Sequence, residues 1–208
     1  MLAYFTLPLL LLSANSPDNP ASQFPGKIKE VRTGTQERMI VGSGTVTMNI
    51  DFERLKGVRS GDQEMKRDTL HFEVHPNSFF TIRIMNGGLR GPESGSMKLS
   101  WTNSSVLPEP LGNSSAQLLL EKTQSKEGFD LVIRDGKAGL VLFNVRGPDY
   151  EYDAVTRSFR MNGGTLLISA EFANKLGRPA DAGVVVGNIS ITAAMVPIET
   201  TKVVNGVA

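Results

Sequence analysis

Apolar and polar residues alternate with a period of two along much of the chain. In Thr45–Phe52, valine, methionine, isoleucine and phenylalanine take every second position, and threonine, asparagine and aspartate take the others. This alternation is typical of a β-strand with one buried face. The same pattern predicts three further strands, at Leu70–Val74, Phe79–Met85 and Met97–Trp101.

The later half of the chain is more apolar and contains two predicted hairpins. Phe129–Arg134 and Gly139–Val145 flank Asp135-Gly136, a dipeptide that favours a tight turn because glycine tolerates a positive φ. Tyr150–Asp153 and Ser158–Met161 form a second predicted hairpin, in which the Asp153 side chain can hydrogen-bond the turn backbone.

Three more elements complete the expected pattern. Asn162–Gly164 predicts a turn that leads into a strand at Thr165–Ile168, and the last predicted strand is Val184–Val196. A short helix is expected between them, with Ser169 as N-cap and Gly177 at its end.

The predicted fold is therefore all-β, an antiparallel β-sandwich or barrel with one short helix. Phe172, Ala173 and Leu176 form one apolar stripe on that helix. We expect Phe172 and Leu176 to pack on the apolar segment Leu140–Val145, because they lie one helical turn apart.

The N-terminus predicts export. Leu2–Leu12 is an apolar run with the length of a signal core, shorter than the about 20 residues of a membrane-spanning helix. Residues 1–22 are the predicted signal peptide, 23–26 a linker, 27–200 a single β-sandwich domain, and 201–208 a tail or the start of a linker to another domain. No basic residue precedes the apolar run, so a start codon placed too late and an apolar strand of a cytosolic protein remain alternatives.

The composition of the chain excludes or disfavours several kinds of binding partner and of chemistry. The net charge is +1, and acidic and basic residues are interspersed, which argues against nucleic acid and against a polybasic membrane site. Cysteine is absent, which excludes disulfides, thiol chemistry and cysteine-based zinc sites. After Leu12 no apolar stretch is long enough for a transmembrane helix.

Three segments carry a family resemblance. Leu167–Pro179, Ala182–Ile191 and Asp130–Gly139 resemble a module found near the N-terminus of large exported bacterial proteins. The resemblance covers roughly residues 27–200. It implies a bacterial, secreted or cell-surface protein and a non-catalytic module with no assigned activity, and it transfers no functional residue.

His71, Glu73 and His75 are the first candidate metal ligands, since they share one face of a predicted strand. Two histidines and one carboxylate form the ligand set of non-haem iron sites and some zinc sites. His71 and His75 would lie roughly 13 Å apart at the rise of a strand, so one ion needs further ligands from elsewhere. The plainer interpretation places all three in water, because Leu70, Phe72 and Val74 take the core face.

Asp149, Glu151 and Asp153 are the second candidate set, and their carboxylate oxygens suit calcium. They lack the loop pattern that wraps a calcium ion, so a solvated strand face is the default interpretation. Calcium is the one cofactor that the sequence suggests.

No nucleophile elbow or phosphate-binding glycine loop accompanies these candidates. Trp101 alternates with Met97 and Leu99, which favours a place in the core over a sugar-stacking role. The sequence favours a non-catalytic structural, adhesion or binding module with a protein or glycan partner at the cell surface. The alternative is a cupin-like or other β-sandwich metalloenzyme that uses His71, Glu73 or His75, so the question of enzyme activity stays open at this point.

Overall fold

The computed structural model describes residues 34–58, 67–102, 108–111, 117–123 and 131–203 of the chain, all of which belong to one compact unit. The predicted signal peptide, 1–22, and linker, 23–26, lie outside these residues. The elements in chain order are β1 (Gly34–Ile50), α1 (Phe52–Leu55), β2 (Asp68–Val74), β3 (Phe79–Met85), β4 (Gly88–Trp101), β5 (Gln117–Lys122), β6 (Leu131–Asp135), β7 (Val141–Arg146), β8 (Asp149–Asp153), β9 (Ser158–Ile168), α2 (Ala170–Lys175), the 3₁₀ helix η1 (Pro179–Asp181) and β10 (Val185–Val203).

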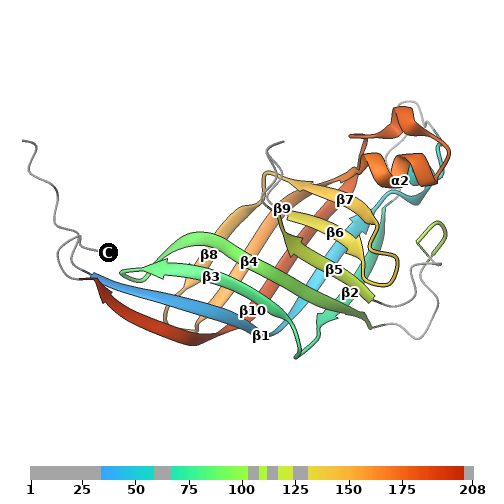
Figure 1. Ribbon diagram of the computed structural model, residues 1–208. Coiled ribbons are helices and arrows are strands. Elements are labelled where there is room, and N and C mark those ends of the chain that lie inside the picture. Colours follow the sequence, from blue (N-terminus) through green and yellow to red (C-terminus); the bar gives the residue numbers. More distant parts are fainter. Residues whose placement is uncertain (1–33, 59–66, 103–107, 112–116, 124–130, 204–208) are drawn as a thin grey trace, which may run out of the picture. The chain divides into compact units, whose positions relative to one another are not determined.

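The strands form one antiparallel ten-stranded sheet that closes on itself (Figure 1). Its order is β10-β1-β2-β4-β5-β6-β7-β9-β8, and β9 also pairs with β10, which returns the order to its start. β2 and β3 share one position between β1 and β4, each pairing with a different half of β1. The predicted all-β antiparallel class is thereby confirmed, and the arrangement is barrel-like.

The alternating apolar residues point to the inside of the closed sheet. Phe72, Phe80, Phe143 and Phe159 are essentially fully buried, and the rings of Phe80 and Phe159 lie 6.4 Å apart. Burial of each such side chain contributes about 1.5–3 kcal/mol relative to leaving it exposed. Trp101 packs on this core with its ring 5.1 Å from that of Phe72, so the predicted core role of Trp101 is confirmed.

The predicted helix is present, and a second, shorter helix adds to it. Ser169 Oγ accepts the Phe172 N–H at 2.9 Å and caps α2. Phe172 packs edge-on against Phe143 of β7 at a ring distance of 5.8 Å, and Leu176 packs at the margin of the core, as expected. The unexpected helix is α1, which begins where the sequence predicted that the first strand would continue to Phe52.

Asp51 explains why that strand stops early. Its Oδ1 accepts the Arg54 N–H at 2.9 Å, so Asp51 caps α1, and β1 ends at Ile50. Arg178, which follows α2, donates to the carbonyl of Leu55 at the end of α1. Both helices therefore lie at the same end of the sheet.

The predicted turn at Asn162–Gly164 is wrong, because β9 runs without interruption from Ser158 to Ile168. β9 advances from Met161 to Gly164 while β10 advances only from Ile189 to Ile191, so β9 carries a β-bulge. Gly163 has φ +68°, a conformation that glycine adopts without strain. The glycines thus accommodate an extra residue within the strand.

Two other strand boundaries differ from the predicted ones. The hairpin between β6 and β7 is present, but its loop extends from Gly136 to Leu140, and the Asp135 N–H donates to the Leu140 carbonyl at 2.8 Å. Residues 129 and 130 of the predicted strand lie outside the described part of the chain. β10 continues past the predicted end at Val196, and past residue 200, to Val203.

Candidate functional site

The first candidate metal set lies in a row on the outside of the sheet. His71 and Glu73 are exposed residues of β2, and His75 is an exposed residue that opens the turn to β3. The Nδ1 atom of His71 lies 3.4 Å from the hydroxyl of Thr47, and the Nδ1 atom of His75 accepts the Asn77 N–H at 3.2 Å. One nitrogen of each ring thus contacts a local polar group of the fold.

The second candidate set lies on the exposed face of β8. Asp149, Glu151 and Asp153 are all exposed there. Asp153 accepts the Val155 N–H at 2.8 Å and both the hydroxyl and the N–H of Thr156, at 2.8 and 3.3 Å. These hydrogen bonds, that of the Thr156 hydroxyl first, lower the pKa of Asp153. The prediction that Asp153 binds the turn backbone is confirmed.

Within the residues that the structure describes, no three histidine, aspartate or glutamate side chains converge on a point where a metal ion could bind. Neither predicted metal set gains geometric support. Alternate residues of a strand share a face but lie about 6–7 Å apart along it. An ion needs several ligand atoms within about 2–2.6 Å, so a row on one strand does not bring them close enough.

A small open hollow lies over the hairpin of β8 and β9. It has a volume of about 120 Å³ and is lined by Glu151, Tyr152, Asp153, Ser158 and Arg160. Glu151 and Arg160 occupy opposite positions in the two strands and bring both charge signs to its wall. At about 30 Å³ per water molecule, the hollow has room for a few waters or one small polar group.

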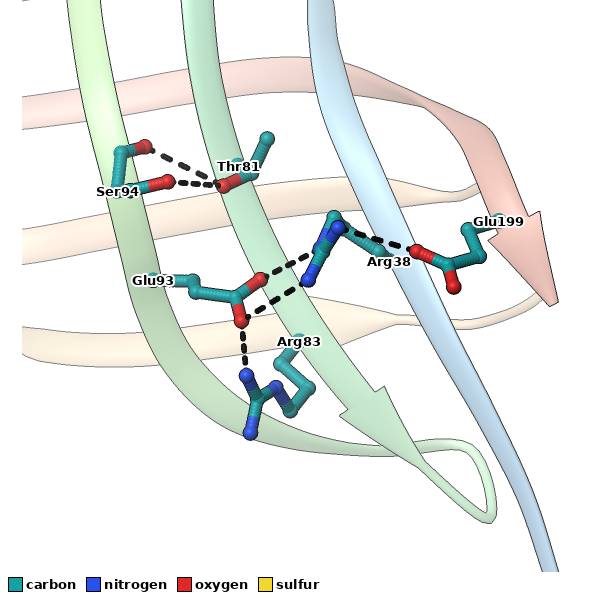
Figure 2. A network of polar contacts seen from close by, with 6 residues as sticks. All are labelled: Arg38, Thr81, Arg83, Glu93, Ser94 and Glu199. Carbon is teal, nitrogen blue, oxygen red and sulfur yellow. Dashed lines mark hydrogen bonds and ion pairs between the residues drawn. The ribbon is translucent and has the colours of Figure 1, made fainter. Parts of the chain in front are cut away.

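A network of charged side chains on the outside of the sheet was not predicted (Figure 2). Arg38 of β1 contacts Glu93 of β4 through Nε at 2.9 Å and Glu199 of β10 through Nη1 at 3.0 Å. Arg83 of β3 also donates to Glu93. One carboxylate therefore joins three strands, and the network extends to a fourth.

The register of the strands creates this network. Arg38 lies opposite Arg83, and Glu93 follows Pro92, which pairs with Ile82, the residue before Arg83 in β3. The residues are far apart in the sequence and share no motif there. The pairing of β1 with β3, of β3 with β4 and of β1 with β10 brings them together, and the sequence did not predict these pairings.

The pKa of Glu93 is lowered, although partial burial of its carboxylate acts to raise it. Partial burial is the largest effect and raises the pKa of Glu93, whose side chain is 19% exposed. Hydrogen bonds and charge attraction from Arg38 and Arg83 together outweigh burial, so the pKa falls below its ordinary value of 4.5.

Glu93→Gln should therefore reduce the loss of stability in acid. A lowered folded-state pKa adds stability that is present above the unfolded-state pKa and is lost as the pH falls through the folded-state pKa. Denaturant unfolding at a series of pH values from neutral to acid should show a smaller fall for the variant than for the parent. Glu73→Gln, on the exposed face of β2, is the control. Identical pH profiles for the parent and Glu93→Gln would contradict the assignment.

Comparisons with known proteins found no relative: no protein-family model, no curated protein and no solved structure matches the chain. The resemblance to a module of large exported bacterial proteins stays a prediction. In the described part of the chain, no helix is long and apolar enough to span a membrane.

Proposed function

We propose that this chain is a non-catalytic module of an exported bacterial protein, with a structural, adhesive or other binding role. Its partner is a protein or a glycan that contacts the outside of the closed sheet. The protein carrying it is secreted or displayed at the cell surface.

The observation that carries this proposal is that the buried polar residues of the described part of the chain hydrogen-bond the backbone or pair strands. Asp51 caps α1 and Ser169 caps α2, and Asp135 accepts the N–H groups of Lys137 and Ala138 in the turn between β6 and β7. Each of these contacts shapes the backbone, and none places a reactive group in a cavity.

Ser78 and Thr81, which are also buried in the described part of the chain, have the same kind of role. Ser78 Oγ donates to the His75 carbonyl at 2.6 Å and accepts the Lys98 N–H at 2.9 Å, which ties a turn to β4. Thr81 joins β3 to Ser94 of β4 at 3.1–3.3 Å. Burial of polar groups is expensive unless they are hydrogen-bonded, and here the hydrogen bonds stabilise turns, caps and strand pairs.

These contacts support a scaffold interpretation. The interior is filled by apolar side chains such as Phe80, Met48 and Ile133, and the polar side chains of β1, β2 and β10 face outward. This arrangement leaves the outer face of the sheet as the surface on which a partner would bind, which supports a structural or binding module.

Export is tested by the N-terminus of the mature protein. When the gene is expressed in a bacterium, we expect the protein in the secreted or surface fraction, with residues 1 to about 22 removed. N-terminal sequencing of that fraction gives the cleavage site. A protein found in the cytosol with Met1 in place would contradict the export part of the proposal.

A further inference from the structure

β8 has one unpaired edge. It pairs with β9 along its whole length, from Asp149 opposite Asn162 to Asp153 opposite Ser158, and this register is unbroken. In the described part of the chain, no strand pairs with the other side of β8. β4 passes in front of β8 in Figure 1 and comes close to it, but the two strands form no ladder. An unpaired strand edge is a template for pairing with another chain.

The outer face of β8 carries a carboxylate at every position. Asp149, Glu151 and Asp153 are exposed on this face. Tyr150 and Tyr152, which lie between them, pack against the core. Any strand that pairs with the free edge of β8 must therefore place its own outward side chains beside three carboxylates.

The sequence of β8 reads the same in both directions, Asp-Tyr-Glu-Tyr-Asp. Two copies that pair antiparallel across this edge are related by a two-fold axis, the usual symmetry of a homodimer. Directly opposite residues then lie on the same face, so outward residues face only outward residues. With the axis at Glu151, Asp149 faces Asp153 of the second copy and Glu151 faces its counterpart. Arg160 lies opposite Glu151 on β9, away from the free edge, so it does not stand between the two copies.

Every other two-fold register also sets a carboxylate against a carboxylate, because all three outward residues of β8 are acidic. Like charges directly opposite each other destabilise a strand pair, whereas aromatic pairs such as Tyr150 with Tyr152 of a second copy stabilise it. The edge of β8 is therefore self-complementary except for its carboxylates.

We propose that the carboxylate row of β8, Asp149, Glu151 and Asp153, prevents this free edge from pairing with a second copy of the chain. The inference does not depend on the proposed function. It gives the residues that first suggested calcium a role that needs no bound ion.

The experiment measures the mass of the full chain by sedimentation over a concentration series for the parent and for Asp149→Thr/Glu151→Thr. Asp153 is kept because it binds the turn backbone, and the double change leaves no carboxylate pair when the axis lies at position 151. The control, Glu53→Thr/Glu73→Thr, removes the same charge from exposed residues of α1 and β2. We expect the β8 variant to associate at least about tenfold more tightly than the parent and the control.

A disulfide tests the register of that association. The chain contains no cysteine, so an introduced one can link only to its counterpart in a second copy. At the two-fold axis position 151 faces itself, at a separation that a disulfide can span. On oxidation, Asp149→Thr/Glu151→Cys should form a linked dimer faster than the control Glu53→Thr/Glu73→Cys.

Circular dichroism establishes that each variant is folded. If the threonine variant melts below the working temperature, Asp149→Asn/Glu151→Gln removes the same charges with nearly the same shape. The proposal is overturned if both folded variants sediment as the parent does. It is also overturned if they associate but Glu151→Cys links no faster than Glu73→Cys.

Discussion

Phe172→Ala is expected to lower the free energy of unfolding by about 3–5 kcal/mol. The Phe172 side chain is 1% exposed and packs edge-on against Phe143, so its removal leaves a cavity between α2 and β7. The α2 backbone is capped by Ser169 and cannot easily collapse into that space. Denaturant unfolding followed by circular dichroism measures the loss.

Phe79→Ala is the matched control, because it removes the same atoms from a side chain that is 59% exposed. Its loss should be at most about 1 kcal/mol, as for other surface substitutions. Equal losses in the two variants would show that α2 does not close the core in the way described.

Gly95→Ala should be the second strongly destabilising change. Gly95 has φ +96°, and a Cβ there would overlap the backbone oxygen of Phe79 on the paired strand β3. The positive φ should lower the free energy of unfolding by about 1–3 kcal/mol. The overlap should add about 1–3 kcal/mol more, because β3 and β4 must move apart.

Gly91→Ala separates these two contributions. Gly91 lies on the same strand with φ +112°, but a Cβ there meets nothing within 4 Å. Its loss should reflect the backbone strain alone and be smaller than that of Gly95→Ala. Equal unfolding free energies for the two variants would contradict the close approach of β3 to Gly95.

Local features of the fold could be predicted from the sequence because each depends on neighbouring residues. The alternation in Thr45–Ile50 predicted the strand and its buried face. The Ser169 cap and the apolar stripe that includes Phe172 predicted α2 and its contact with β7. The turn role of Asp153 followed from its side chain alone.

The features that were not predicted depend on pairing between distant strands. No local pattern indicates that β9 closes the sheet on β10, or that β1 pairs with both β2 and β3. The contact of Arg38 with Glu93 follows from the pairing of β1 with β3. Gly163 shows the same dependence on pairing. Its positive φ is compatible with a turn and with a β-bulge, and the pairing of β9 with β10 decides between them.

The central claim is that the chain is a scaffold module and not a metalloenzyme. The most direct test is to measure thermal melts of the parent and of His75→Ala, each with and without a chelator. His75 is an exposed residue whose ring accepts a backbone N–H of its own turn. We predict that the chelator leaves the melting temperature of both proteins unchanged and that His75→Ala melts close to the parent. A chelator-sensitive melt in the parent that disappears in His75→Ala would contradict the account.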